Sequence, residues 1–303
     1  MRSASRSAGV ERPSLADRAP LSNLPAMSED AVALRFPSPT GDEIPPREPG
    51  MVDLWCYFPE SSHDPELLSA QAALMTPDEH ERCGRFHFER ERRLFIATRA
   101  LARTVLSSYF PVAPGDWRFS NAEHGKPFIA SPILRPRLQF NLAHTQGLVV
   151  CVVSAAHELI GVDAEMIEGG RDIFRDAERY LSLSERGKLR ACPTPKRPRL
   201  FLAYWTLKES FAKARGEGLS LPLDGSSFHF EEDAIHIVLD PSLAEDATSW
   251  RFALLDASPH HIIAVAVKTS GAPLTLRITH IVPLGKAAEG TQLAAISRAD
   301  LLK

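Results

Sequence analysis

The segment IGVDAEM, residues 160–166, alternates apolar side chains with small or acidic ones and predicts a β-strand. Side chains two residues apart in a strand lie on the same face, about 6.6 Å apart. Asp163 and Glu165 therefore project from one face, while the apolar residues beside them face the core. Two convergent carboxylates suit a hard divalent cation such as Mg²⁺. Taken alone, however, a D-x-E pattern is more typical of an ordinary half-exposed strand.

A long helix is predicted about forty residues further on, over Arg199–Arg215. Trp205, Glu209 and Lys213 are spaced four apart and share one of its faces. An ordinary exposed Glu–Lys pair would explain two of them. A tryptophan on the same face is unusual for a fully solvated helix. A partly buried Glu and Lys beside it would need a charged partner, such as a metal ion or a phosphate.

Outward from these two segments, the predicted elements occur in the same order twice. The first pass has a strand at 52–58, helices at 64–75 and 89–109, a helix start at 76–79, and strands at 117–120, 126–129, 138–142 and 147–154. The second pass has a strand at 160–166, helices at 172–181, 184–190 and 199–215, and strands at 227–230, 235–239, 251–256, 262–268 and 274–281. Grouped helices followed by grouped strands favour an α+β fold over a doubly wound sheet. We expect two similar α+β halves, residues 51–156 and 157–284, with the metal site in the second.

The two ends of the chain differ from this body. Residues 1–50 hold 8 of the 24 prolines and a single aromatic residue, so they cannot bury enough apolar surface to fold. We expect a disordered tail over 1–50 and a second tail over 285–303. The longest nearly unbroken apolar run has ten residues, 147–156, which is too short to span a bilayer.

Charge and cysteine content narrow the class of protein. The 303 residues carry a net charge of −3, which argues against a protein that coats nucleic acid. The four cysteines form no C-x-x-C pair, which indicates reduced thiols in a cytoplasmic protein rather than zinc ligands or disulfides. A local basic patch remains compatible with the overall charge.

Two further groups of residues are candidates for anion binding. His144 follows a predicted strand within Asn141–Thr145, where it could meet an anion, although a lone histidine is more often structural. Arginines gather between residues 82 and 99, and a G-K-P turn places Lys126 further on. Runs of charged residues usually form solvent-exposed faces. In an acidic protein, however, this group of basic residues could bind phosphates.

Together these motifs resemble the signature of the 4′-phosphopantetheinyl transferases. GVDAE at 161–165 and WTLKESFAKARGEGL at 205–219 carry the resemblance, and the W-x-x-K-E-x-x-x-K-x-x-G-x-G-L run is the specific part. The chain length, the G-K-P turn and NLAHT at 141–145 resemble the larger Sfp-type branch, in which two similar halves are fused. Ala143 and Ala164 depart from the family's usual serine and isoleucine, and the N-terminal extension has no counterpart.

The resemblance implies an enzyme that transfers the phosphopantetheine arm of coenzyme A to a serine of an apo-acyl or peptidyl carrier protein. The serine hydroxyl would attack the β-phosphorus, and 3′,5′-ADP would leave. Asp163, Glu165 and Glu209 would bind Mg²⁺. Glu209 would also take the serine proton.

The family's phosphate-binding positions map onto several basic residues. Lys213 would hold the pyrophosphate, in preference to Lys208, and the remaining basic residues would contact the other phosphates. His144 and Arg82 match positions that bind the 3′-phosphate. The other expected coenzyme A contacts are Arg92, Arg99, Lys126 and Lys208.

Two other functions remain open from the residues themselves. Three carboxylates also suit a Mg²⁺-dependent phosphodiester hydrolase. A non-catalytic scaffold that binds carrier proteins or coenzyme A is the alternative outside enzymes. We expect a cytoplasmic monomer whose partners include neither nucleic acid nor membrane.

Overall fold

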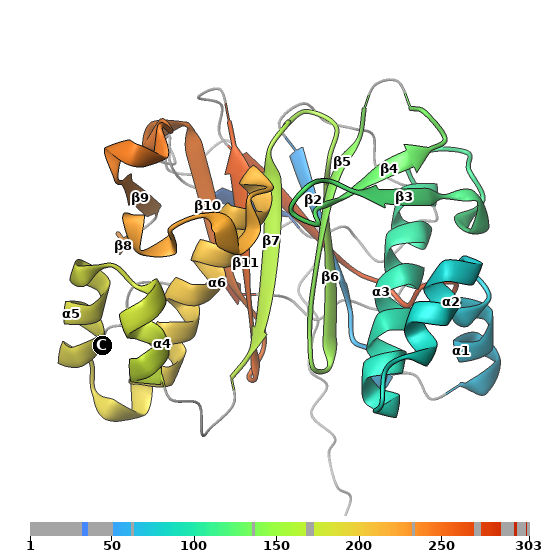
Figure 1. Ribbon diagram of the computed structural model, residues 1–303, viewed down its shortest axis with the longest axis horizontal. Helices are drawn as coiled ribbons and strands as arrows, with labels where there is room; N and C mark the ends of the chain where they lie inside the picture. The colour runs from blue at the N-terminus through green and yellow to red at the C-terminus, as the bar shows by residue number, and fades with distance from the viewer. Residues whose placement is uncertain are drawn as a thin grey trace, which may run out of the picture.

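Two larger β-sheets, each covered by one 19-residue helix, dominate the computed structural model of the protein (Figure 1). It describes residues 32–35, 51–61, 64–134, 137–167, 173–231, 234–269, 274–285, 294–295 and 301. Helix α3 (Glu89–Ser107) packs on the first sheet and α6 (Arg197–Arg215) on the second. The predicted α+β class is confirmed.

The strands divide between the two sheets as follows. The first sheet has the order β1 (Val32–Arg35), β12 (Leu274–His280), β2 (Met51–Tyr57), β6 (Leu148–Ser154) and β5 (Gln139–Thr145). The second has the order β13 (Ala294–Ala295), β10 (Trp250–Ser258), β11 (His261–Lys268) and β7 (Ile160–Met166). Strands β5 and β7 are thus edge strands of different sheets.

Shorter elements surround the sheets and the two long helices. The hairpins are β3 (Arg118–Asn121) with β4 (Pro127–Ser131), and β8 (Ser226–Phe230) with β9 (Ile235–Leu239). The other α-helices are α1 (Pro65–Ala72), α2 (Pro77–Gly84), α4 (Ile173–Tyr180) and α5 (Leu183–Ala191). No helix among the described residues is both long and apolar enough to cross a membrane.

Strand alternation explains how the layers pack. In β2, Leu54 faces an apolar cluster shared with the second sheet, whereas Trp55 faces α3. In β7, Val162 and Ala164 join the shared cluster, so Asp163 and Glu165 face α6, as the alternation predicts. The two sheets therefore meet through their inner faces, and each long helix covers an outer face.

The ends of the helices follow local sequence signals. Thr76 caps α2 in a capping box with Glu79, which confirms the predicted helix start. Gly216 ends α6 in the left-handed conformation, with φ of 75°. The glycine fixes the C-terminal end of α6 and hence the last turn that faces β7.

The last strand of the predicted second half, β12, belongs to the first sheet. Strand β12 pairs parallel with β2, with Leu276 opposite Val52. A buried ion pair fixes it there: Arg277 donates to both carboxylate oxygens of Asp53, at 2.5 and 2.8 Å. Spacing along the chain cannot reveal this return, because both partners read as ordinary strands.

Four residues of the predicted N-terminal tail form a strand. Val32–Arg35 is β1, which pairs parallel with β12 at Leu274–Arg277. The remainder of 1–50 lies outside the described residues. In the predicted tail 285–303, only Gly285, Ala294–Ala295 and Leu301 are described, and Ala294–Ala295 pairs with β10.

Candidate active site

Helix α6 and strand β7 face each other along their predicted faces. Trp205 and Lys213 lie eight residues apart, about 12 Å along the helix, whereas Asp163 and Glu165 lie about 6.6 Å apart along the strand. The two long side chains converge on the carboxylates, Trp205 on Glu165 and Lys213 on Asp163, with a donor–acceptor distance of 2.6 Å in both pairs. Glu209 lies between these pairs on α6. The predicted face of Trp205, Glu209 and Lys213 thus meets the predicted face of the D-x-E strand.

Gly161 allows α6 to approach β7 this closely. A Cβ atom at this position would lie 2.1 Å from the backbone oxygen of Ser210 and 2.4 Å from the nitrogen of Ala214. Neither backbone atom can move without shifting the helix. The sequence motif contains this glycine, but only the helix packing shows why no side chain fits.

Two carboxylate oxygens at this contact lack hydrogen-bond partners. Asp163 Oδ2 and Glu209 Oε1 are both buried and unpartnered. Burial raises the pKa of Glu209, the charge of Asp163 raises it further, and Lys213 opposes the shift. Buried carboxylate oxygens without partners are what a bound cation would satisfy.

The carboxylates do not form a ready cluster of metal ligands. No three His, Cys, Asp or Glu side chains among the described residues are grouped as a metal site. The ammonium of Lys213 lies against Asp163, and the indole of Trp205 holds Glu165. The oxygen-only donor set and the two unpartnered atoms nevertheless fit Mg²⁺.

His144 comes to this site from the other half. Asn141 of β5 accepts a hydrogen bond from the backbone nitrogen of Val162 in β7 at 3.0 Å, which joins the two edge strands. His144 is exposed at the surface. The surrounding protein still removes part of its hydration, and this desolvation lowers the pKa of its imidazole. The charges of Lys213 and Arg99 lower it further, and Asp163 opposes them.

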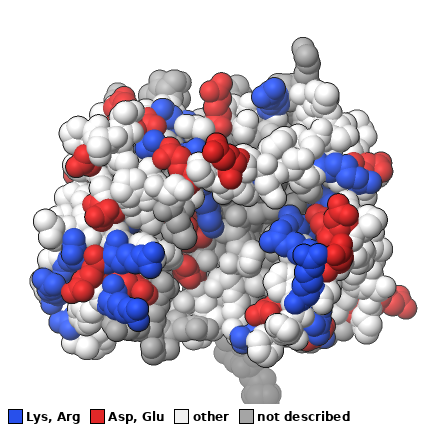
Figure 2. All heavy atoms as spheres, viewed as in Figure 1, with Lys and Arg blue, Asp and Glu red and all other residues white. Residues whose placement is uncertain are grey.

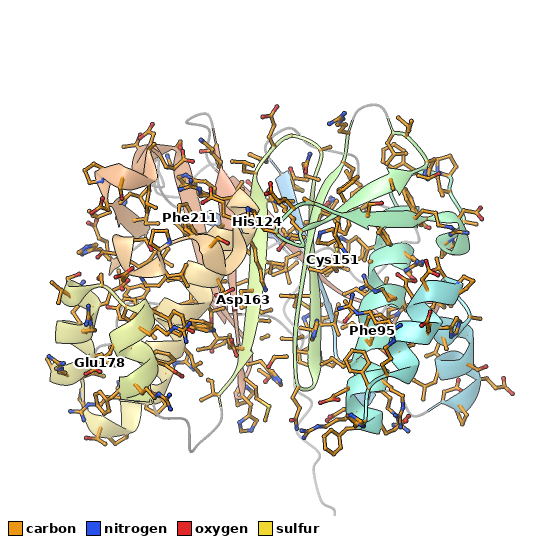
Figure 3. The ribbon with its side chains drawn as sticks, in the orientation of Figure 1. Phe95, His124, Cys151, Asp163, Glu178 and Phe211 are labelled. Carbon is orange, nitrogen blue, oxygen red and sulfur yellow. The ribbon has the colours of Figure 1, made fainter. Side chains whose placement is uncertain are left out.

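The arginines beyond His144 form a second basic group. Arg82 and Arg99 lie over the same ring, with guanidinium carbons 5.6 and 4.8 Å from the centroid of Phe95. Desolvation lowers the pKa of Arg99, as do the charges of Arg82 and Arg103, while Glu79 opposes these effects from 3.4 Å. Figure 2 shows this face hollowed between the halves, with basic side chains gathered over α2 and α3. Asp163 lies at the boundary between the halves, and Phe95 lies on α3 (Figure 3).

The structure overturns the prediction that Lys208 contacts coenzyme A. Its side chain is completely buried, with Nζ 2.9 Å from the equally buried Glu185. It also donates to the backbone oxygens of Leu223, at 2.8 Å, and of Ser226. Lys208 therefore joins α6 to α5 and the start of β8 within the core.

Lys126 and Arg92 also have structural partners in place of the predicted phosphate contacts. Lys126 Nζ donates to the backbone oxygens of Ala214 at 2.9 Å and Ile160 at 3.3 Å, and burial lowers its pKa to about 8. It thereby ties the β3–β4 turn, where His124 lies in Figure 3, to the end of α6. Arg92 donates to Glu89 and to the backbone oxygen of Phe86, and so braces the turn before α3.

A separate apolar cavity of about 360 Å³ lies beneath α1 and the start of α3. Tyr57, Leu68 and Leu94 are among the residues that line it. None of the predicted site residues lines this cavity. The cavity is therefore distinct from the carboxylates between β7 and α6.

Two family models match successive parts of the chain. Residues 61–157 match the family model described as 4′-phosphopantetheinyl transferase, N-terminal, and residues 159–266 match that of the 4′-phosphopantetheinyl transferase superfamily. The 4′-phosphopantetheinyl transferase HetI of Nostoc sp. is 32% identical over 221 residues, 73% of this chain and 89% of that protein. The transferase Sfp of Bacillus subtilis is 34% identical over 162 residues, 53% of this chain and 69% of that protein.

A solved structure also aligns with part of the chain. It is the holo-(acyl-carrier-protein) synthase from Bacillus anthracis in complex with CoA (3′,5′-ADP), which covers 38% of this chain and 98% of its own, with 17% identity and a TM-score of 0.31. The family models and the curated relatives establish that the chain belongs to the 4′-phosphopantetheinyl transferase superfamily. It is an enzyme of that type, which transfers 4′-phosphopantetheine from coenzyme A to carrier proteins.

Proposed function

We propose that this transfer takes place between β7 and α6, at the carboxylates that face Lys213. The observation that carries the proposal is the pair of buried, unpartnered oxygens on Asp163 and Glu209. Lys213 lies 2.6 Å from Asp163, and the charges of Lys213 and Asp163 both act on His144 from the other half. A substrate with several phosphates could span such a site.

Asp163, Glu165 and Glu209 are the residues that would hold Mg²⁺. When bound, the ion neutralises charge on the pyrophosphate oxygens and favours departure of the nucleotide. Lys213 adds an ammonium donor to the pyrophosphate, and it leaves Asp163 when the phosphate arrives. These residues therefore bind and orient the reacting phosphate.

Glu209 is the proposed general base. The serine hydroxyl oxygen of the carrier protein forms a bond to the β-phosphorus, the bond from that phosphorus to the bridging oxygen breaks, and 3′,5′-ADP departs with the electron pair. The hydroxyl proton would move to the carboxylate of Glu209, through the oxygen that the ion leaves free.

The 3′-phosphate of coenzyme A would bind to His144, Arg82 and Arg99. Arg99 and His144 interact electrostatically, and Arg82 shares the Phe95 ring with Arg99. A guanidinium group presents a fork of N–H donors that suits a phosphate. Lys126 and Arg92 hold protein groups instead, so they support the site without contacting the nucleotide.

The test measures the mass added to an apo-carrier protein with coenzyme A and Mg²⁺. Asp163→Asn, Glu165→Gln and Glu209→Gln keep side-chain volume and should each lower transfer at least 100-fold, since each removes a negative charge that balances the ion. Glu178→Gln changes an exposed carboxylate on α4 and should have no effect. Cleavage of coenzyme A without modification of the carrier would favour the hydrolase, and binding without chemistry would favour the scaffold.

The remaining proposals concern the setting of the enzyme. We propose a cytoplasmic monomer, supported by four free cysteines that are all buried and by a site drawn from both halves of one chain. Carrier proteins and coenzyme A are its partners, and we propose neither nucleic acid nor membrane as a further one.

A further inference from the structure

The indole of Trp205 holds one of the proposed metal ligands. Its Nε1 donates to Glu165 Oε1 at 2.6 Å, a short hydrogen bond to a carboxylate. We propose that Trp205 is a positioning residue, which fixes the carboxylate of Glu165 for the divalent cation without touching the reacting atoms. This inference rests on the proposed function, because it assumes that Glu165 binds the metal.

Glu165 needs such support more than Asp163 does. Asp163 is buried and lies against Lys213, whereas Glu165 is half-buried near the end of an edge strand. A glutamate has three side-chain torsions, and ordering such a flexible side chain carries an entropic cost. If the indole orders it beforehand, that cost does not fall on metal binding.

Aromatic neighbours fix the indole itself. Tyr180 packs edge-on against Trp205, with centroids 4.7 Å apart and planes at 65°. Phe201, one turn earlier on α6, stacks on it at 6.5 Å and 13°. The donor direction is thus set by α4 and α6 together. An indole N–H donates but cannot accept, so it orients the carboxylate without competing as a metal ligand.

A purely structural role makes a different prediction. If the bond merely satisfied a partly buried N–H, its loss would lower stability and leave metal affinity unchanged. Outer partners of metal ligands, in contrast, typically change metal affinity about 10–100-fold when they are removed. Metal affinity therefore separates the two roles.

The experiment titrates the full-length protein with Mn²⁺ and follows free Mn²⁺ by electron paramagnetic resonance, in the presence of coenzyme A. Trp205→Phe removes the N–H and keeps an aromatic ring between Tyr180 and Phe201. We expect Mn²⁺ to bind about 10–100-fold more weakly to this variant. In a Glu165→Gln background, the same substitution should change the affinity no further.

Trp250→Phe is the matched control. Trp250 is buried in the same half, and its Nε1 has no hydrogen-bond partner. This variant should bind Mn²⁺ as the wild type does. If Trp205→Phe fails to fold, 3-benzothienylalanine at position 205 keeps the two-ring shape, replaces the N–H with sulfur and should show the same loss of affinity.

Each outcome bears on a separate step. Equal Mn²⁺ affinity in Trp205→Phe and wild type would overturn the positioning role and leave the proposed metal site intact. Equal affinity in Glu165→Gln and wild type would overturn Glu165 as a ligand, and the inference with it. A similar loss in Trp250→Phe would show a general packing effect and would also overturn the inference.

Discussion

His144 joins the charge environments of the two halves. Its pKa lies below the usual value because of desolvation and the charges of Lys213 and Arg99, with Asp163 opposing. The ordinary pKa of histidine is about 6.5, so a lowered pKa favours the neutral imidazole in the free enzyme. A dianionic phosphate placed against it would raise that pKa and favour the imidazolium.

We therefore expect coenzyme A to bind with uptake of a proton near pH 7, and more weakly as the pH rises above the pKa of the complex. Calorimetry in two buffers of different ionisation enthalpy measures the uptake. His144→Gln should abolish it and raise KM for coenzyme A more than it lowers kcat, since the 3′-phosphate is remote from the breaking bond. Equal proton uptake with 3′-dephospho-coenzyme A would contradict this placement of the phosphate.

Two lysines on α6 show how far single residues can be interpreted from sequence. Lys208 and Lys213 are five positions apart, which places them about 140° apart around the helix. One is buried with Glu185, and the other lies against Asp163. The spacing from Trp205 and Glu209 identified the face of Lys213. Nothing in the sequence places Glu185 opposite Lys208, because that partner comes from a separate helix.

At the scale of elements, the contact between α6 and β7 depends on Gly161. Gly161→Ala would drive a Cβ into the backbone of Ser210 and Ala214, so α6 must move away from β7. We expect a loss of about 2–4 kcal/mol in the free energy of unfolding, of the size of strong core disruptions. Transfer should fall by more than the folded fraction does, because Lys213 and Glu209 move with the helix.

Gly187→Ala is the control for Gly161→Ala. Gly187 lies within α5, and a Cβ there meets nothing within 4 Å. Alanine should stabilise that helix by about 0.5–1 kcal/mol. Urea denaturation and transfer assays on both variants check these expectations. Unchanged stability in Gly161→Ala would mean that the helix tolerates a wider separation from β7.

Element positions were predictable to within a few residues, and their partners were not. Strand β7 and the C-terminal end of α6 lie where the alternation and the Gly216 signal place them. Periodicity indicates which face of an element is buried, but it does not indicate which other element packs against that face. The bond from Asn141 to Val162 and the contacts of Lys126 join distant segments, so both required the structure.

At the scale of the whole molecule, the N-terminal segment adds a strand to the first sheet. Deletion of residues 1–31 keeps β1, whereas deletion of 1–50 removes it and leaves one edge of β12 unpaired. We expect both truncated enzymes to retain transfer. The longer deletion should lower stability by roughly 1 kcal/mol, or about 2–4 °C in Tm. Loss of transfer in a folded 1–50 deletion would assign the segment a role in the reaction.

The return of β12 to the first sheet also has a consequence for synthesis on the ribosome. Arg277 is made 224 residues after its partner Asp53. At a translation rate of about 5–20 residues per second, β12 is synthesised roughly 10–45 s after β2. During that time one edge of β2 is open, and open edges invite pairing with other chains. The nascent protein is therefore most exposed to aggregation and to chaperone capture until β12 emerges, long after its first half has been translated.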